Sequence, residues 1–407
     1  MRLLIFFCVF CLSFSVTKAQ SLTHEQYKED FEQFWKEVND HFAYFHIQQT
    51  RWDQVKEGHQ QQLDTVQTRK QFVTLLESMI HELYNGHVSL NTNTPASPRL
   101  IPSGADVWVE KKGNDFIIEG IYEGGKAEKA GLRVGMQVIA FNDVPVKEAA
   151  QVFLPRSVEK PDTEVWRYAA NVLLAGKRNE TRKITIQTSD GQQDFFPDAY
   201  TADAKDGKLS SQILESSLGV VRLHNSLGDK ETIAAFDQVL DDLMAQGVDK
   251  LILDLRDVPS GGTNTVAKGI MGRFISDELP YQRYRFTDDE RDTDVPALWM
   301  EYVMPRGNTF TGKVALLCNQ WTGSIGEAMV IGFDGMARAT IFGTRMAGLL
   351  GAIDDYKLKH SKIGFQIPIT RLYHIDGTAR EDFRPAYILK DNEACFEAAK
   401  TWLLQQK

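Results

Sequence analysis

Apolar residues near the start of the chain recur with the spacing of helices. Between residue 21 and about residue 90 they fall at intervals of three and four, which is typical of helices that bury one face. The apolar positions of the first predicted helix are Tyr27, Phe31, Phe34, Trp35, Val38, Phe42 and Phe45. A second predicted helix, from Phe72 to Leu83, should end near Asn85-Gly86, because both residue types tolerate a left-handed helix end. His87 follows that end directly.

The middle of the chain has the pattern of short strands. A linker rich in Pro, Ser, Thr and Asn spans about 92–104, and apolar strands are predicted at 107–109 and 116–118. Small residues, a short helix, a glycine turn and another apolar strand follow within 125–139, and a hairpin comes next. A second polar, turn-rich stretch at 197–212 separates this part from the remainder.

Beyond about residue 213, predicted strands and helices alternate. The strands are expected at 219–223, 250–255 and 313–318, and the helices at 234–244, at 263–274 and from about 325 onward. Such alternation predicts a largely parallel sheet that binds ligands at the carboxyl ends of its strands.

The first residues have the features of a secretory leader. Arg2 is followed by an apolar run over 3–16, which is too short to span a bilayer, and small residues surround Lys18. We therefore expect a signal peptide over 1–19, a mature chain that begins near Gln20, and a secreted or periplasmic location. An uncleaved membrane anchor is the alternative. No later apolar run is long enough for an integral membrane segment.

Composition excludes several other classes of protein. Only Cys318 and Cys395 lie beyond the leader, so no disulfide framework is expected. The net charge of -9 is spread without a basic block, which argues against nucleic-acid binding. The chain has no metal-ligand pattern such as HExxH, and we expect neither a metal nor a cofactor.

One serine has a position suited to nucleophilic chemistry. Ser324 lies between a predicted strand and a predicted helix, where the first backbone N–H groups of the helix are unpaired. Such donors suit an oxyanion that forms during acyl transfer. The alternative is an ordinary helix-capping serine, with Glu327 completing a capping box.

A glycine-rich turn after a central strand suggests a second part of the same site. Asp254-Leu255-Arg256 is followed by Pro259-Ser260-Gly261-Gly262, and glycine lets the backbone approach a substrate closely. A plain strand-to-helix turn is the alternative.

Together these segments resemble the tail-specific (C-terminal-processing) protease family, peptidase family S41. The family patterns "DLR-x-N-P-G-G" and "T-x-S-x-x-E" are matched at 254–262 and 322–327, with Ser324 at the nucleophile. The resemblance implies an α/β, ClpP/crotonase-like peptidase domain over 213–407 and a helical part over 20–95 that contributes to the catalytic unit. The stretch 125–139 resembles PDZ domains, so 105–195 is expected to be an inserted PDZ-like β module. Such a module binds extended peptide by strand addition, and a structural spacer is the alternative.

The resemblance also guides the choice of base. One branch of the family uses a lysine, but Leu349 stands at that position and cannot accept a proton. The tricorn-like branch uses a histidine in an "L-x-D-G-H" pattern, which 83–87 resembles with Asn85 in place of the acid. His87 is therefore the predicted base, and a histidine that caps helix carbonyls is the alternative. We prefer it to His224, His360 and His374.

The family further implies a glutamate near the chain end that orients the histidine. Glu381 matches best, Asp382 is a rival, and either residue can instead be a solvated loop charge. The resemblance places the oxyanion between the N–H group of Ile325 and that of Gly261 or Gly262.

The sequence therefore predicts a serine-type peptidase that cleaves peptides or unstructured protein tails through an acyl-enzyme. A binding protein for peptides or apolar ligands on the same scaffold is the main alternative, and an envelope scaffold is a third. The sequence predicts no oligomeric state.

Overall fold

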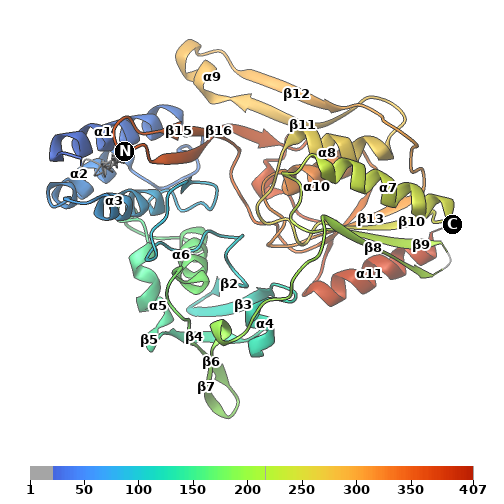
Figure 1. Cartoon of the computed structure of the whole chain (residues 1–407), viewed down its shortest axis with the longest axis horizontal. Helices are drawn as coiled ribbons and strands as arrows, with labels where there is room; N and C mark the ends of the chain where they lie inside the picture. Colours follow the sequence, from blue (N-terminus) through green and yellow to red (C-terminus); the bar gives the residue numbers. More distant parts are fainter. Residues whose placement is uncertain (1–21, 216, 407) are drawn as a thin grey trace, which may run out of the picture.

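The computed structural model describes residues 22–215 and 217–406, so the predicted leader at 1–19 lies outside the described residues. The described part is a mixed α/β structure whose strands form three sheets (Figure 1). Within those residues, no helix combines the length and the apolar character that crossing a membrane requires.

The predicted parallel sheet is present. Its strand order is β17 (Tyr387–Ile388), β14 (Thr340–Gly343), β13 (Lys313–Cys318), β10 (Lys250–Asp254), β9 (Leu218–Leu223) and β8 (Leu209–Glu215). Neighbouring strands are parallel except for β8, which is antiparallel to β9. The predicted α/β class with a largely parallel sheet is confirmed.

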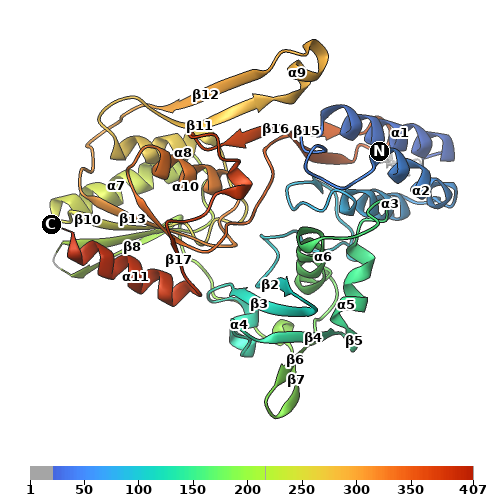
Figure 2. The same cartoon turned by 180° about the vertical axis from the view of Figure 1, so that it is seen from behind.

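Helices cover both faces of this sheet, which explains its continuous apolar strands. One face packs on α7 (Glu231–Ala245), α8 (Asn264–Met271) and α10 (Ile325–Gly335), and the other on α11 (Asn392–Gln405) (Figures 1 and 2). Leu251 and Leu253 of β10 belong to the first core, whereas Ile252 belongs to the second. Alternate residues of one strand thus enter opposite cores.

A second, antiparallel sheet was not predicted. It contains β1 (Ser89–Leu90), β16 (Gly364–Tyr373), β11 (Leu279–Phe286) and β12 (Ala297–Val303), and β15 (Ala352–Lys357) also pairs with β16. β11 and β12 form a long arm capped by α9 (Thr287–Thr293), which projects from the body of the molecule in Figure 2. The pairing of β1 with β16 brings the segment after His87 beside the late part of the chain.

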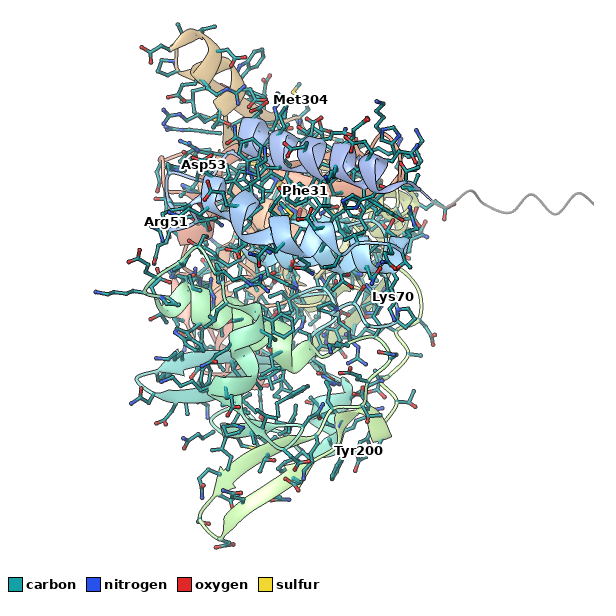
Figure 3. The ribbon with its side chains drawn as sticks, turned by 90° about the vertical axis from the view of Figure 1, so that its left-hand side faces the viewer. Phe31, Arg51, Asp53, Lys70, Tyr200 and Met304 are labelled. Atoms are coloured by element: carbon teal, nitrogen blue, oxygen red, sulfur yellow. The ribbon has the colours of Figure 1, made fainter. Side chains whose placement is uncertain are left out.

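The helical front part contains α1 (His24–His41), α2 (Trp52–Asp64) and α3 (Arg69–His81). Capping boxes begin α1 at Thr23 and α3 at Thr68. Figure 3 shows Phe31 on the inner side of α1, whereas Arg51 and Asp53 point outward. These helices share one core with the late segment 350–367.

The third sheet lies in the predicted β module. Its antiparallel strands, in spatial order, are β2 (Val107–Lys112), β3 (Asp115–Ile121), β4 (Gln137–Phe141), β6 (Ile184–Thr188) and β7 (Gly191–Phe195), and the short β5 (Val144–Pro145) pairs with β4. The helices are α4 (Lys126–Ala130), α5 (Val146–Ala149) and α6 (Thr163–Ala175). The long helix α6, which packs on β2, was not predicted. A PDZ-like character and the domain boundaries stay predictions.

The shared core of the front part predicts the effect of Phe34→Ala. Phe34 is fully buried, and its ring lies 4.8 Å from that of Phe365 in β16, measured between ring centroids. Truncation should lower the free energy of unfolding by about 3–5 kcal/mol, because it removes apolar contacts and leaves a cavity. Urea unfolding followed by circular dichroism measures the change. Ile47→Ala, at a side chain that is 53% exposed, should change it by less than about 0.5 kcal/mol.

Candidate active site

Ser324 stands at a sharp turn between β13 and α10. Its backbone has φ +52° and ψ -113°, in a region that residues other than glycine rarely occupy. Such a conformation costs about 1–3 kcal/mol and persists only where the surroundings hold it. Here Thr322 Oγ1 donates to the carbonyl of Leu255 (2.9 Å) and accepts from the N–H of Asn319 (3.0 Å), which ties the turn to the strand beside it.

His87 comes from the front of the chain and reaches this serine. Its Nε2 lies 3.1 Å from Ser324 Oγ, across 237 positions of sequence. Its Nδ1 lies 2.6 Å from the carbonyl oxygen of Leu350, which can only accept a hydrogen bond. The proton of the neutral ring therefore lies on Nδ1, and Nε2 is free to accept the hydroxyl proton of Ser324.

Burial keeps this imidazole neutral. The His87 side chain is buried, and loss of hydration together with the nearby positive charge of Arg380 lowers its pKa to about 4. The ring is therefore unprotonated at neutral pH, as a general base must be.

Asn85 fixes the segment that carries His87. Its Oδ1 accepts the N–H groups of His87 (2.9 Å) and Leu350 (3.2 Å), and its Nδ2 donates to the carbonyl of Gly348 (3.1 Å). The residue that replaces the acid of the family pattern thus joins the histidine turn to the segment 348–350.

Glu327 joins that same segment to Ser324. Its fully buried carboxylate accepts the N–H groups of Ser324 (2.8 Å), Gly348 (3.0 Å) and Leu349 (3.3 Å). The predicted capping interaction at Ser324 therefore exists, and it also supports the serine. Burial raises the pKa of Glu327 to about 7, although Arg380 and the three N–H groups oppose this shift.

Arg380 is a neighbour that sequence reasoning missed. It donates through Nη2 to the carbonyls of Leu349 (2.6 Å) and Gly351 (3.0 Å) and through Nη1 to that of Ser324 (3.3 Å). Its guanidinium lies 3.9 Å from the Glu327 carboxylate, with both side chains out of contact with water. No local pattern marks this arginine, because its partners lie far away in sequence.

The predicted third member, Glu381, follows Arg380 in a short 3-10 helix, η4 (Arg380–Asp382). Burial raises its pKa, and its Oε2 has no hydrogen-bond partner. Within the described residues no hydrogen bond joins Glu381 to His87, whose Nδ1 faces Leu350 instead. Asp382 is exposed. The orienting role of Glu381 stays a prediction.

The glycine turn lies against the serine. Gly261 has φ +68°, and a Cβ added there would lie 2.4 Å from Ser324 Cβ and 3.3 Å from the backbone nitrogen of Ile325. Only glycine fits this position. Gly262 instead faces Leu227, whose backbone an added Cβ would meet at 2.2 Å. Of the two predicted glycines, Gly261 is therefore the one beside the Ser324 hydroxyl and the Ile325 N–H group.

The other candidate bases have other partners. His224 Nε2 lies 3.0 Å from Ser210 Oγ, and His360 Nε2 lies 2.7 Å from a carboxylate oxygen of Glu29. His374 is flanked by carboxylates at 2.9 Å and 3.3 Å. Leu349, at the position of the lysine base, lies between Gly86 and Gly323, where an added Cβ on either glycine would meet its side chain at 3.1 Å.

Comparison with known proteins finds two matching family models. Residues 217–386 match the model of peptidase family S41, and residues 23–81 match the model of the tricorn protease C1 domain. A search of curated proteins finds no match.

Two solved structures illustrate the similarity in fold. The photosystem II D1 C-terminal processing protease is 18% identical with a TM-score of 0.56, and the alignment covers 91% of this chain and 94% of that one. Mature CPAF is 13% identical with a TM-score of 0.62, over 94% of this chain and 96% of that one.

The buried Glu327 predicts a pH dependence of stability. Its pKa is about 7 in the folded chain and near the ordinary 4.5 when unfolded, so the folded state holds this proton more tightly. The stability that it contributes is complete below pH 4.5 and is lost as the pH rises to about 7, a change of about 3 kcal/mol. The difference in unfolding free energy, Glu327→Gln minus wild type, should therefore rise over that range. Urea unfolding from pH 4.5 to pH 8 measures it, and a constant difference would contradict the prediction.

Proposed function

The chain belongs to peptidase family S41, in its tricorn-like branch, and is a serine-type peptidase; we propose that Ser324 is its nucleophile and His87 its general base. The observation that carries this proposal is the 3.1 Å contact between His87 Nε2 and Ser324 Oγ. A hydroxyl and an imidazole from segments so distant in sequence rarely meet by chance at a strained, buried turn.

The proposed reaction begins with proton transfer from Ser324 Oγ to His87 Nε2 as the oxygen attacks a peptide carbonyl. The Leu350 carbonyl, 2.6 Å from Nδ1, keeps the ring in the required tautomer and stabilises the imidazolium that forms. The imidazolium then protonates the leaving amine. An acyl-enzyme remains, and water hydrolyses it with His87 again as the base.

The negative charge of the tetrahedral intermediate would be held by backbone N–H groups. The N–H of Ile325, at the start of α10, is one proposed donor. The N–H of Gly261 is the other, because an added Cβ on Gly261 would touch Ser324. This N–H donates to the carbonyl of Val258 at 3.3 Å and would have to exchange that bond for the oxyanion. The positive end of the helix dipole adds to their effect.

We propose peptides or unstructured protein tails as substrates, in a secreted or periplasmic location. The family implies a peptide or protein substrate, and the apolar run over 3–16 with its basic start supports export.

A fluorophosphonate probe tests the nucleophile, because it phosphonylates an activated serine hydroxyl. The wild type should be labelled at Ser324, and Ser324→Ala should lose at least about 99% of the label, since no other activated oxygen replaces it. Peptide mapping by mass spectrometry identifies the site. Ser276→Ala, at an exposed loop serine, is the matched control and should label normally. Absence of label from the folded wild type, together with tight binding of a peptide or lipid, would favour a carrier.

The lowered pKa of His87 predicts how the rate of fluorophosphonate labelling falls at acid pH. Because the ring stays neutral down to about pH 4, the labelling rate should fall only well below pH 6.5, the ordinary histidine value. Rates measured from pH 3.5 to pH 8 locate the inflection. The Glu327→Gln variant should show the same inflection, because the group that titrates is His87 and not the nearby carboxylate. An inflection at pH 6.5 would contradict the lowered pKa of His87, and an unchanged labelling rate in His87→Ala would contradict its role as the base.

A further inference from the structure

The turn at 319–324, called the nucleophile turn below, inserts one large side chain into the β module. Trp321, three positions before Ser324, is 1% exposed and belongs to the hydrophobic core of the module. Its indole Nε1 donates to the carbonyl of Ala105 at 2.8 Å. Its ring centroid lies 5.4 Å from that of Tyr122 and 6.5 Å from that of Trp108.

The module leaves room for this insertion at one glycine. A Cβ on Gly120 of β3 would lie 3.1 Å from the Trp321 ring and 2.8 Å from Gln320 Oε1. Gln320 also donates through Nε2 to the carbonyl of Glu119 (3.3 Å). Strand β3 and the nucleophile turn therefore lie closer together than they could if residue 120 carried a side chain.

The same face of the module also holds the glycine turn. The Tyr122 hydroxyl donates to the carboxylate of Asp257, which is 1% exposed and lies four positions before Gly261. Lys205, from the connection between the module and the parallel sheet, donates to the same carboxylate at 2.5 Å. Its amine lies 4.3 Å from the centroid of the Tyr122 ring.

The nucleophile turn and the glycine turn also form hydrogen bonds with each other. The N–H of Val258 donates to the carbonyl of Trp321 (3.2 Å), and the N–H of Gly323 donates to the carbonyl of Val258 (3.3 Å). A displacement of Trp321 would therefore move both Ser324 and the turn that holds Gly261.

The edge strand of the module is already occupied. On β2, the N–H and the carbonyl of Val109 are both bonded at 2.9 Å by the side-chain amide of Asn171, from α6. Strand addition needs such an edge to be unpaired. At this position a peptide would have to displace a buried intramolecular amide.

We infer that the module at 105–195 is a fixed support of the catalytic turn, with Trp321 as the positioning residue through which it acts. This inference rests on the proposed roles of Ser324 and His87. Trp321 touches no reacting atom, and it sets where the Ser324 hydroxyl stands relative to His87 and to the oxyanion donors. An error of about 1 Å in that placement is enough to slow the reaction about a hundredfold.

Trp321→Phe tests the inference, because it keeps an apolar ring but removes the N–H bond to Ala105 and leaves space beside Trp108. Fluorophosphonate labelling at several probe concentrations separates the maximal labelling rate constant from the apparent affinity for the probe. We expect the rate constant to fall by about tenfold to a hundredfold with little change in affinity. Tyr122→Phe, a second variant that preserves the ring, should lower it in the same way.

Trp166→Phe is the matched control. Trp166 lies on α6 of the same module, with its ring 6.0 Å from that of Phe116. Among the described residues, neither a hydrogen bond nor a ring contact joins Trp166 to the nucleophile turn, so the rate constant of this variant should stay at the wild-type value. Thermal unfolding of each variant shows whether the module stays folded at the assay temperature. Wild-type rate constants in both Trp321→Phe and Tyr122→Phe would overturn the positioning role alone. An unlabelled wild type would overturn the proposed catalytic pair and this inference with it.

Discussion

The contact between the Ser324 hydroxyl and the His87 imidazole constrains how the helical front part and the parallel-sheet part of the chain pack. The serine belongs to the parallel sheet and the histidine follows the front helices, so the two parts must meet within one hydrogen-bond length. The pairing of β1 with β16 and the shared core of α1–α3 with 350–367 bring them together. Small errors in either interface would separate the two groups, and extensive apolar burial is what limits such errors.

Two buried charges surround this contact, and each is compensated. The Glu327 carboxylate accepts three backbone N–H groups, and the Arg380 guanidinium donates to three carbonyls. An unpaired charge in such a place would cost several kcal/mol. Because all six of these bonds end on the backbone, they fix the course of the chain at 324 and at 348–351. The strained φ of Ser324 is tolerated within this network.

Much of the fold follows from local patterns. Strands at 250–255 and 313–318 were predictable because both of their faces are buried, which makes their residues continuously apolar. The antiparallel arm was missed because β11 and β12 mix arginines and exposed apolar residues, without a regular alternation. Helix α6 was missed although its signals are present, since Asp162 caps it and apolar residues follow.

Some residues of the candidate site were likewise predictable from the sequence, and others were not. Ser324, His87 and the glycine turn were recognisable from motifs, because their chemistry restricts the residue types nearby. The Leu350 carbonyl, Asn85 as a link and Arg380 were not recognisable. Each acts through at least one partner that lies 29 to 265 positions away in sequence. Tertiary packing alone creates those contacts, so no spacing in the chain announces them.

The surroundings of Leu349 restrict which residues can stand at position 349. Its side chain fills the space between the two glycines that flank the histidine turn and the serine turn, and its own carbonyl is bonded to a buried guanidinium. A lysine at this place would have to fit a longer side chain between the same two glycines, on a backbone whose carbonyl already accepts from the Arg380 guanidinium. A longer residue in place of Leu349 therefore requires changes at its neighbours as well.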